Sequence, residues 1–390
     1  MIEFEFWYLL ALPLLFGAGG LARGFESRAR ATDQAGLPRS YFRGLNLLLN
    51  DQHDKAIDAF IEVVKLDPET IELHHALGNL FRRRGEFDRA VRIHTHLLNR
   101  ADLPASARSQ ALAELGQDYL KGGLLDRAED AFTRLLEDTH HRFDALRALL
   151  RIYQMEREWL KAVDCARLLE REAGESHGVA ISHFYCELAA SALEQGRFDE
   201  AQEAIDEALA AHRKSVRALI LAGDLQMKRG NRGDALRQWL NVEAASPDHV
   251  PLIASRVAEA MDAAGDRAGA LNWLKRALLD MPSIDLLDVA QKRVNEWEGP
   301  TAAEALVGEE LRRHPSLLGF ERLLESRLAM SKDDGELQLL ASLLRGQTRK
   351  LARYRCTRCG FRAREYHWNC PGCTGWDTYP PRRIEELDVA

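Results

Sequence analysis

The stretch GLNLLLNDQHDKAIDAFIEVVKLDP, from Gly44 to Pro68, decides the fold, because its pattern returns along most of the chain. A glycine is followed twelve residues later by an alanine, then four later by a large apolar residue and eight later by a proline. The glycine and the alanine return 34 residues on, at Gly78 and Ala90. The alanine then recurs at steps of 34 to 39 residues, at Ala128, Ala162, Ala201, Ala235, Ala270 and Ala305. This period indicates a repeat protein.

Each repeat has room for two amphipathic helices. In the first repeat we expect an A helix over residues 41–50 and a B helix over residues 53–65, whose apolar residues recur at helical spacing. The glycine and the alanine are small because the two helices cross there. One hairpin cannot bury its apolar face alone, so neighbouring repeats are expected to stack into a solenoid with a continuous core.

The repeats resemble the tetratricopeptide repeat family, in Leu77-Gly78…Phe81…Ala90…Leu97 and in Ala222-Gly223…Ala235…Trp239…Pro247. We count eight units in an array over residues 37–347, in which residues 316–347 supply either a ninth unit or a capping helix pair. The sequence therefore predicts an all-α superhelical solenoid. Such a solenoid presents a long groove to a partner.

The composition is that of a folded protein, with 390 residues, 46% hydrophobic and 29% charged, and the formal net charge of −7 gives no general argument for nucleic acid. The repeats contain no HExxH motif, no nucleophile–base pair and no phosphate-binding loop. Their histidines and carboxylates show no site-forming pattern. We therefore expect a protein that is not an enzyme and has no catalytic residues.

The N-terminal segment Phe6–Ala22 carries no charge and is mostly large and apolar. A cleaved signal peptide or a buried helix are the alternatives, but acidic residues precede the segment and arginines follow it, at Glu3, Glu5, Arg23, Arg28, Arg30, Arg39 and Arg43. By the positive-inside rule this order predicts one transmembrane helix within residues 1–23, with its N-terminus outside and the rest of the chain in the cytoplasm. Residues 24–36 read as a tether.

The C-terminal residues 348–390 contain two Cys-x-x-Cys pairs separated by ten residues, Cys356/Cys359 and Cys370/Cys373. Two such knuckles place four thiolates at tetrahedral spacing, and Gly360 and Gly372 are expected to allow the tight turns. We predict a small metal-binding ribbon in which zinc is favoured and iron is the alternative. The ribbon resembles rubredoxin and other zinc ribbons. The side chains expected to pack it are Tyr354, Phe361, Tyr366, Trp368 and Trp376.

Eight basic residues and no acidic one lie between Arg345 and Arg364. They are compatible with three interpretations: binding of nucleic acid, contact with anionic lipid, or attachment of the ribbon to the acidic solenoid. Because the repeat array is net negative, we favour attachment to the solenoid.

The combination of an outward-facing N-terminus, one span, cytoplasmic repeats and a four-cysteine ribbon resembles the lipopolysaccharide assembly protein B family of Gram-negative bacteria. The residues that carry the resemblance are Phe6–Ala22, the repeats, and Cys356, Cys359, Cys370 and Cys373.

The resemblance implies an inner-membrane adaptor that brings the deacetylase committing lipid A synthesis to a membrane-bound AAA+ protease. It also implies links to the lipopolysaccharide export machinery and to a membrane protein that senses lipopolysaccharide. A redox protein with iron, or a nucleic-acid-binding ribbon on a repeat scaffold, are the alternatives, although no nucleic acid is expected. The sequence leaves self-association open.

Overall fold

A computed structural model describes residues 43, 46–47, 50, 52–66, 70–331 and 334–388. The predicted span Phe6–Ala22 and the tether over residues 24–36 lie outside these residues. Among the helices of the described part, none is both long enough and apolar enough to cross a membrane. The described chain divides into two compact units, and the boundary in the sequence falls between Ile152 and Tyr153.

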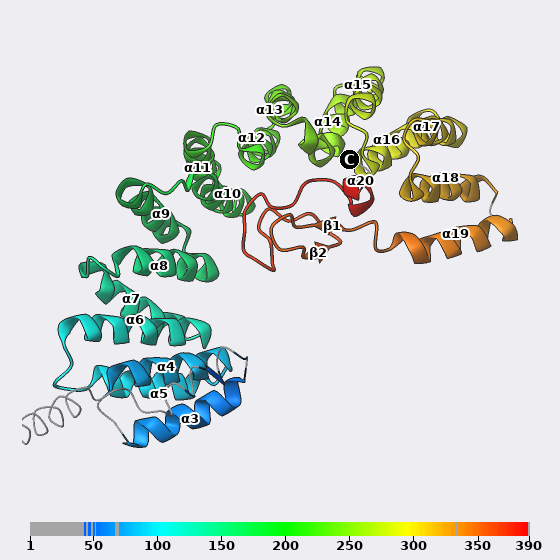
Figure 1. The fold of residues 1–390 in the computed structure, drawn as a ribbon. Coiled ribbons are helices and arrows are strands. Elements are labelled where there is room, and N and C mark those ends of the chain that lie inside the picture. Colours follow the sequence, from blue (N-terminus) through cyan, green and yellow to red (C-terminus); the bar gives the residue numbers. More distant parts are fainter. Residues whose placement is uncertain are drawn as a thin grey trace, which may run out of the picture. The chain divides into compact units, whose positions relative to one another are not determined.

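Unit 1 consists of stacked antiparallel helices (Figure 1). Its elements are α3 (His53–Leu66), α4 (Ile71–Arg83), α5 (Phe87–Leu98), α6 (Ala105–Lys121), α7 (Leu125–Arg134), the short 3₁₀ turn η1 (Leu135–Glu137) and most of α8 (Arg142–Glu156).

Unit 2 is itself a stack of helices and ends in the ribbon. Its helices are α9 (Trp159–Ala173), α10 (Gly178–Glu194), α11 (Phe198–Ala211), α12 (Val216–Lys228), α13 (Arg232–Ala245), η2 (Pro247–His249), α14 (Val250–Ala263), α15 (Arg267–Asp280), α16 (Ile284–Trp297), α17 (Pro300–Arg313), α18 (Leu317–Met330) and α19 (Gly335–Thr348). The ribbon contains β1 (Tyr354–Arg355), β2 (Arg362–Ala363) and α20 (Ile384–Asp388), and β1 pairs antiparallel with β2. Figure 1 shows the ribbon on the inside of the arc that the helices of unit 2 form.

The repeated alanine is the fourth residue of each B helix and is completely buried, at Ala56, Ala90, Ala128, Ala162, Ala201, Ala235 and Ala270. This confirms the crossing point predicted for seven repeats. The prediction of Ala305 was wrong, because that side chain is exposed. The buried alanine of α17 is Ala303, since Pro300 begins this helix and makes Ala303 its fourth residue.

The repeated glycine lies under the aromatic ring of the B helix. A Cβ atom at Gly78 would lie 2.4 Å from the His94 ring, and one at Gly223 would lie 2.3 Å from the Trp239 indole. Any larger residue would therefore force the two helices of a repeat apart, as the sequence pattern predicted.

The turn between an A helix and its B helix needs a left-handed residue. In the described residues six of these turns use glycine with φ between 74° and 95°, at Gly85, Gly123, Gly196, Gly230, Gly265 and Gly299. The turn between α8 and α9 uses Arg157 instead, with φ of 61°.

We expect Arg157→Gly to raise the free energy of unfolding of unit 2 by about 0.5–1 kcal/mol, because relief of the strained arginine exceeds the chain entropy that glycine loses. Thermal unfolding of the two proteins measures this. Arg237→Gly, in the middle of α13 and also in unit 2, is the control and should lower stability by about 1 kcal/mol. Equal destabilisation by both substitutions would contradict the explanation.

Candidate metal centre and its docking surface

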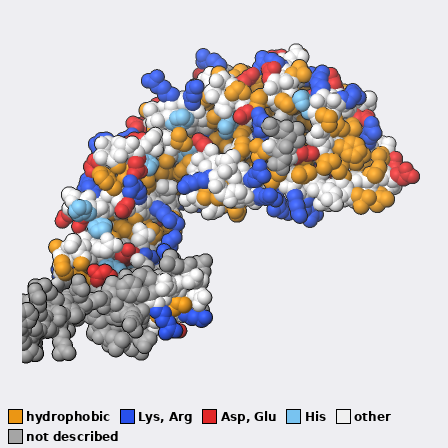
Figure 2. Space-filling view, viewed as in Figure 1, with side chains coloured by type: hydrophobic (Ala, Val, Ile, Leu, Met, Phe, Trp, Pro, Cys, Tyr) orange, Lys and Arg blue, Asp and Glu red, His pale blue; other side chains and the backbone are white. Residues whose placement is uncertain are grey.

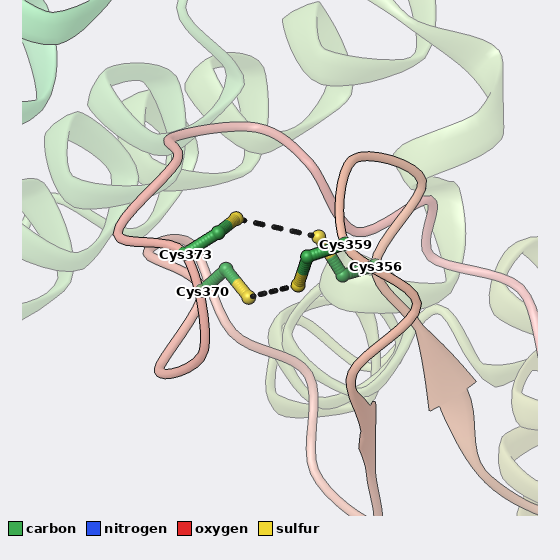
Figure 3. Close-up of side chains that lie close together, drawn as sticks. All are labelled: Cys356, Cys359, Cys370 and Cys373. Carbon is green, nitrogen blue, oxygen red and sulfur yellow. Dashed lines mark hydrogen bonds between the residues drawn. The ribbon is translucent and has the colours of Figure 1, made fainter. Parts of the chain in front are cut away.

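The four ribbon cysteines converge on one point (Figure 3). The Sγ atoms of Cys356 and Cys373 are 3.8 Å apart, those of Cys359 and Cys370 are 3.6 Å apart, and all four lie within 4.8 Å of one another. Zinc–sulfur bonds of about 2.3 Å in a tetrahedron require sulfurs about 3.8 Å apart. The geometry therefore fits a four-cysteine metal site. In the described part of the chain no other cluster of three or more His, Cys, Asp or Glu side chains has this closeness.

The two knuckles share one backbone arrangement. The Cys356 N–H donates to the Phe361 carbonyl and the Cys370 N–H donates to the Gly375 carbonyl, each at 2.9 Å. The left-handed residue that closes the first knuckle is Gly360, as predicted, with φ of 76°. In the second knuckle this position belongs to Thr374, with φ of 55°.

The turn-forming role predicted for Gly372 was therefore wrong. Gly372 is needed for packing instead, because a Cβ atom there would lie 3.1 Å from the Phe361 Cβ.

The electrostatics of the site favour a cation. Although burial opposes the charged form, hydrogen bonds from the Thr378 side chain and from backbone N–H groups of the knuckle lower the pKa of Cys356 to about 6. The Phe361 N–H favours a charged Cys359, but burial and the neighbouring sulfurs outweigh it and raise the pKa of this thiol to about 12. Four thiolates this close repel one another, and a divalent cation between them removes that repulsion.

The interior of the ribbon is small. Its buried residues are Tyr354, Cys356, Cys370 and Tyr379, and Tyr366 packs against them. Tyr354 and Tyr366 were predicted to pack the ribbon and do so, whereas Tyr379 was missed. Phe361 is 43% exposed, contrary to prediction.

Trp368 and Trp376 were also predicted to pack the ribbon. Trp368 does so, because its ring lies edge-on against Tyr366 with centroids 4.9 Å apart, and it contacts the repeats as well. Trp376 contacts the repeats instead. The Trp376 ring stacks on His183 of α10, with centroids 4.7 Å apart, and the Trp368 ring lies parallel to His249 at 6.1 Å. The Nε2 atom of His183 also lies 2.9 Å from Asp377 Oδ1. These contacts, together with Trp159 against Trp376, cover the inner face of unit 2 with the ribbon.

Asp285, in the first turn of α16, is the central polar contact between the repeats and the ribbon. It accepts hydrogen bonds from the Tyr354 hydroxyl at 2.8 Å and from Nε and Nη2 of Arg383 at 3.0 and 2.5 Å. The Arg383 guanidinium lies 4.0 Å from the centre of the Tyr354 ring. Both charges are mostly buried, at 20% and 18% side-chain exposure for Arg383 and Asp285. Removal of either side chain would therefore leave the other charge buried without its partner.

The C-terminal helix α20 completes the attachment. Glu385 accepts from the Leu317 and Leu318 N–H groups at the start of α18, and Glu386 accepts from the Ile284 N–H at the start of α16. Carboxylates at these positions satisfy N–H groups that a helix leaves unpaired and complement the helix dipole.

Basic residues do hold the ribbon to acidic repeats, as the favoured interpretation proposed, but the ion pairs that do so join Arg382 to Asp248 and Arg383 to Asp285. Both arginines lie beyond the basic stretch that suggested the contact. Within that stretch Arg358, Arg362 and Arg364 are exposed.

The histidines of unit 1 are structural, as the sequence suggested, but they meet between helices rather than along one. The His94 ring Nδ1 lies 2.5 Å from Asp118 Oδ2, and Arg82 donates to Asp118 Oδ1 at 2.8 Å. His94 and Asp118 are fully buried, so this network links α4, α5 and α6 inside the core.

The contact at His249 predicts a pH dependence. Burial lowers the pKa of His249, and the carboxylates of Asp377 and Asp248 only partly offset this. The folded state thus binds a proton less readily than the unfolded chain, so the stability contributed by this contact is complete above about pH 6.5 and declines as the pH falls below it. We expect the ribbon's hydrogen exchange, corrected for intrinsic rates, to accelerate below that pH. The free energy of ribbon opening should fall by at most about 1.4 kcal/mol per pH unit.

His249→Gln should flatten this pH dependence. The zinc content of the same samples shows whether faster exchange at low pH comes from loss of the metal instead. An unchanged slope in His249→Gln would contradict the assignment.

Comparison with known proteins agrees with both parts of the chain. Tetratricopeptide repeat models match residues 73–107 and 186–250, and a model described as a rubredoxin metal binding domain matches residues 354–381. Lipopolysaccharide assembly protein B of Escherichia coli (strain K12) is 35% identical over 98% of this chain and 99% of its own length. The chain belongs to the lipopolysaccharide assembly protein B family.

A second member of the family, from Haemophilus influenzae, is 31% identical over 99% of this chain and all of its own length. The repeats and the ribbon are thus both part of the family's sequence. Among solved structures, a tetratricopeptide repeat protein from Parabacteroides merdae is 16% identical over 74% of this chain and 100% of its own. Its TM-score of 0.25 is too low to support an argument.

Proposed function

We propose that the chain is a non-enzymatic adaptor of the inner membrane that restrains lipopolysaccharide synthesis. In this role it presents the deacetylase that commits lipid A synthesis to a membrane AAA+ protease for degradation. Membership of a family whose members are named for lipopolysaccharide assembly supports the proposal. The observation that carries it is the ribbon itself, whose four sulfurs face one another and whose outer side is attached to a protein-binding repeat surface.

For the metal, we propose zinc bound by Cys356, Cys359, Cys370 and Cys373, with rubredoxin-like iron as the alternative. Four protein sulfurs leave no open position for water, which is typical of structural rather than hydrolytic zinc. Zinc would supply folding energy to a ribbon with little core of its own. The folded ribbon then positions Arg383, Trp368 and Trp376 against the A helices.

The ribbon also restricts where a client protein binds. The contacts at His183, His249 and Asp285 occupy the inner face of unit 2 from α10 to α16. The groove predicted to hold a client is therefore filled by the chain's own C-terminal domain in this region. We propose that the client contacts other surfaces of the repeats.

The predicted span in residues 1–23 would place the N-terminus in the periplasm and the repeats in the cytoplasm. Confinement to the membrane plane of a membrane protease raises the effective concentration of the adaptor without any new contact. The export and sensing proteins of lipopolysaccharide are proposed as further partners at this membrane.

Purification of the tagged full-length chain from its native membrane tests the proposal. We expect a membrane AAA+ protease and the lipid A deacetylase to copurify, with about one zinc per chain. In cells without the chain the deacetylase should have a longer half-life, which the wild-type chain restores and a version lacking residues 1–22 does not. Recovery of nucleic acid, or of iron with redox partners, would instead support one of the alternative functions.

A further inference from the structure

The last helix of the repeat stack exposes an apolar face. In α19, Ala341 and Thr348 are buried against the stack, each at 2% exposure. Leu339, Leu340 and Leu343 are 60%, 50% and 62% exposed. At 100° per residue these three leucines lie together on the side of the helix that faces away from the buried pair. The end of a solenoid is normally closed by a polar outer face, so an exposed leucine stripe here indicates a binding partner.

Beside this stripe lies a set of exposed positive charges. Five exposed basic side chains follow α19 along the chain and into the ribbon, and none forms an ion pair with any residue that the structure describes: Arg349, Lys350, Arg358, Arg362 and Arg364. No acidic residue interrupts residues 346–364. Phe361, which is 43% exposed, lies among them in sequence. Figure 2 shows orange side chains at the end of unit 2 where α19 lies, and blue ones along the neighbouring edge near the ribbon.

The two features are held together by short, packed chain. Only residues 349–353 separate α19 from β1, and Leu351 and Ala352 pack against the core of the repeats. The Ile384 N–H donates to the Arg353 carbonyl at 2.8 Å, which ties the connection to the C-terminal segment. The leucine stripe and the basic residues therefore belong to one continuous part of unit 2.

We propose that residues 335–364 form a surface that binds a membrane rich in anionic phospholipid. Leucine and phenylalanine side chains would enter the interface between headgroups and acyl chains, while the basic side chains contact lipid phosphates. Charge decides between the candidate partners. A second copy of this chain at the same surface would oppose five positive charges to five others. Nucleic acid would match the charges but offers no apolar contact for the leucine stripe.

This surface goes beyond the proposed function and needs from it only that the chain resides at a membrane. A lipid contact at the ribbon end would fix a second point of the chain on the bilayer. It would thereby limit the orientations in which the repeats reach a membrane-bound partner.

The test compares the full-length chain in nanodiscs of pure phosphatidylcholine with nanodiscs that also contain phosphatidylglycerol, by hydrogen exchange. We expect amides of residues 335–364 to exchange roughly threefold or more slowly in the anionic nanodiscs, with no change in α12 or α13. Leu339→Ser with Leu343→Ser should abolish the difference, and so should Arg349→Gln with Lys350→Gln. Matched controls are Leu279→Ser, an exposed leucine of α15, and Arg237→Gln, an exposed arginine of α13; both should keep it.

Three results would overturn the proposal: equal exchange in both lipids, protection that rises with protein concentration in neutral nanodiscs, or protection by duplex DNA that exceeds protection by anionic lipid. The predicted membrane anchor is tested separately, by whether the chain stays bound to nanodiscs of pure phosphatidylcholine. Failure of the anchor and failure of the lipid surface are thus distinguishable.

Discussion

Replacement of Cys370 by serine is expected to unfold the ribbon and leave the helical repeats folded. Cys370 is completely buried between the knuckles, and its sulfur lies 3.6 Å from that of Cys359. A structural zinc site contributes on the order of 10 kcal/mol to folding, far more than the few buried tyrosines of this ribbon can replace. Hydrogen exchange of residues 354–381 should approach that of an unfolded chain, and the zinc content should fall well below about one per chain.

Cys186→Ala is the matched control for the loss of a buried thiol. Cys186 lies in α10 next to Ala208 and Ala218, and burial raises the pKa of its thiol to about 12, which disfavours the thiolate that a metal would need. We expect this variant to keep its zinc and to lose only about 1 kcal/mol of stability through the small cavity. Full zinc content and full protection of the ribbon in Cys370→Ser would show that the four sulfurs do not act as a unit.

The features that sequence predicted correctly are the ones set by local spacing. The small residue at a helix crossing must return once per repeat, so the spacing of Gly78, Ala90 and Gly223 is enough to predict the solenoid. The knuckles are equally local, since four residues fix each pair of sulfurs. Ala305 shows the limit of counting, because Pro300 begins α17 early and moves the buried position to Ala303.

The contacts that attach the ribbon to the repeats could not be predicted from residue types. Asp285 is one of 60 acidic residues, and its partner Arg383 lies 98 positions away. Nothing local distinguishes this pair from the many solvated ones. Trp368 and Trp376 were assigned to the ribbon interior because a small domain usually needs its aromatic residues there. The metal site takes over much of that role, so Trp376 contacts His183 instead, and Trp368 packs against both Tyr366 and His249.

Asp285→Ala is the second change for which we expect a large effect, and it acts on docking rather than on the metal. It leaves the Arg383 charge and the Tyr354 hydroxyl without their shared acceptor in a mostly buried position. Loss of one partner of a buried pair usually lowers stability by about 3–5 kcal/mol. We therefore expect residues 364–388 to open several hundred times more often, at unchanged zinc content.

Asp248→Ala is the control that distinguishes the effect of burial from that of charge alone. It removes the acidic side chain of the Arg382–Asp248 ion pair, which belongs to the same interface but is more exposed. The Asp248 side chain is 54% exposed, and exposed pairs contribute about 0–1 kcal/mol, so exchange in this variant should stay close to wild type. Similar acceleration in both variants would mean that general charge attraction holds the ribbon. Under the proposed function, an Asp285 variant that keeps its zinc yet fails to shorten the half-life of the deacetylase would show that this role needs the docked ribbon as well as a filled metal site.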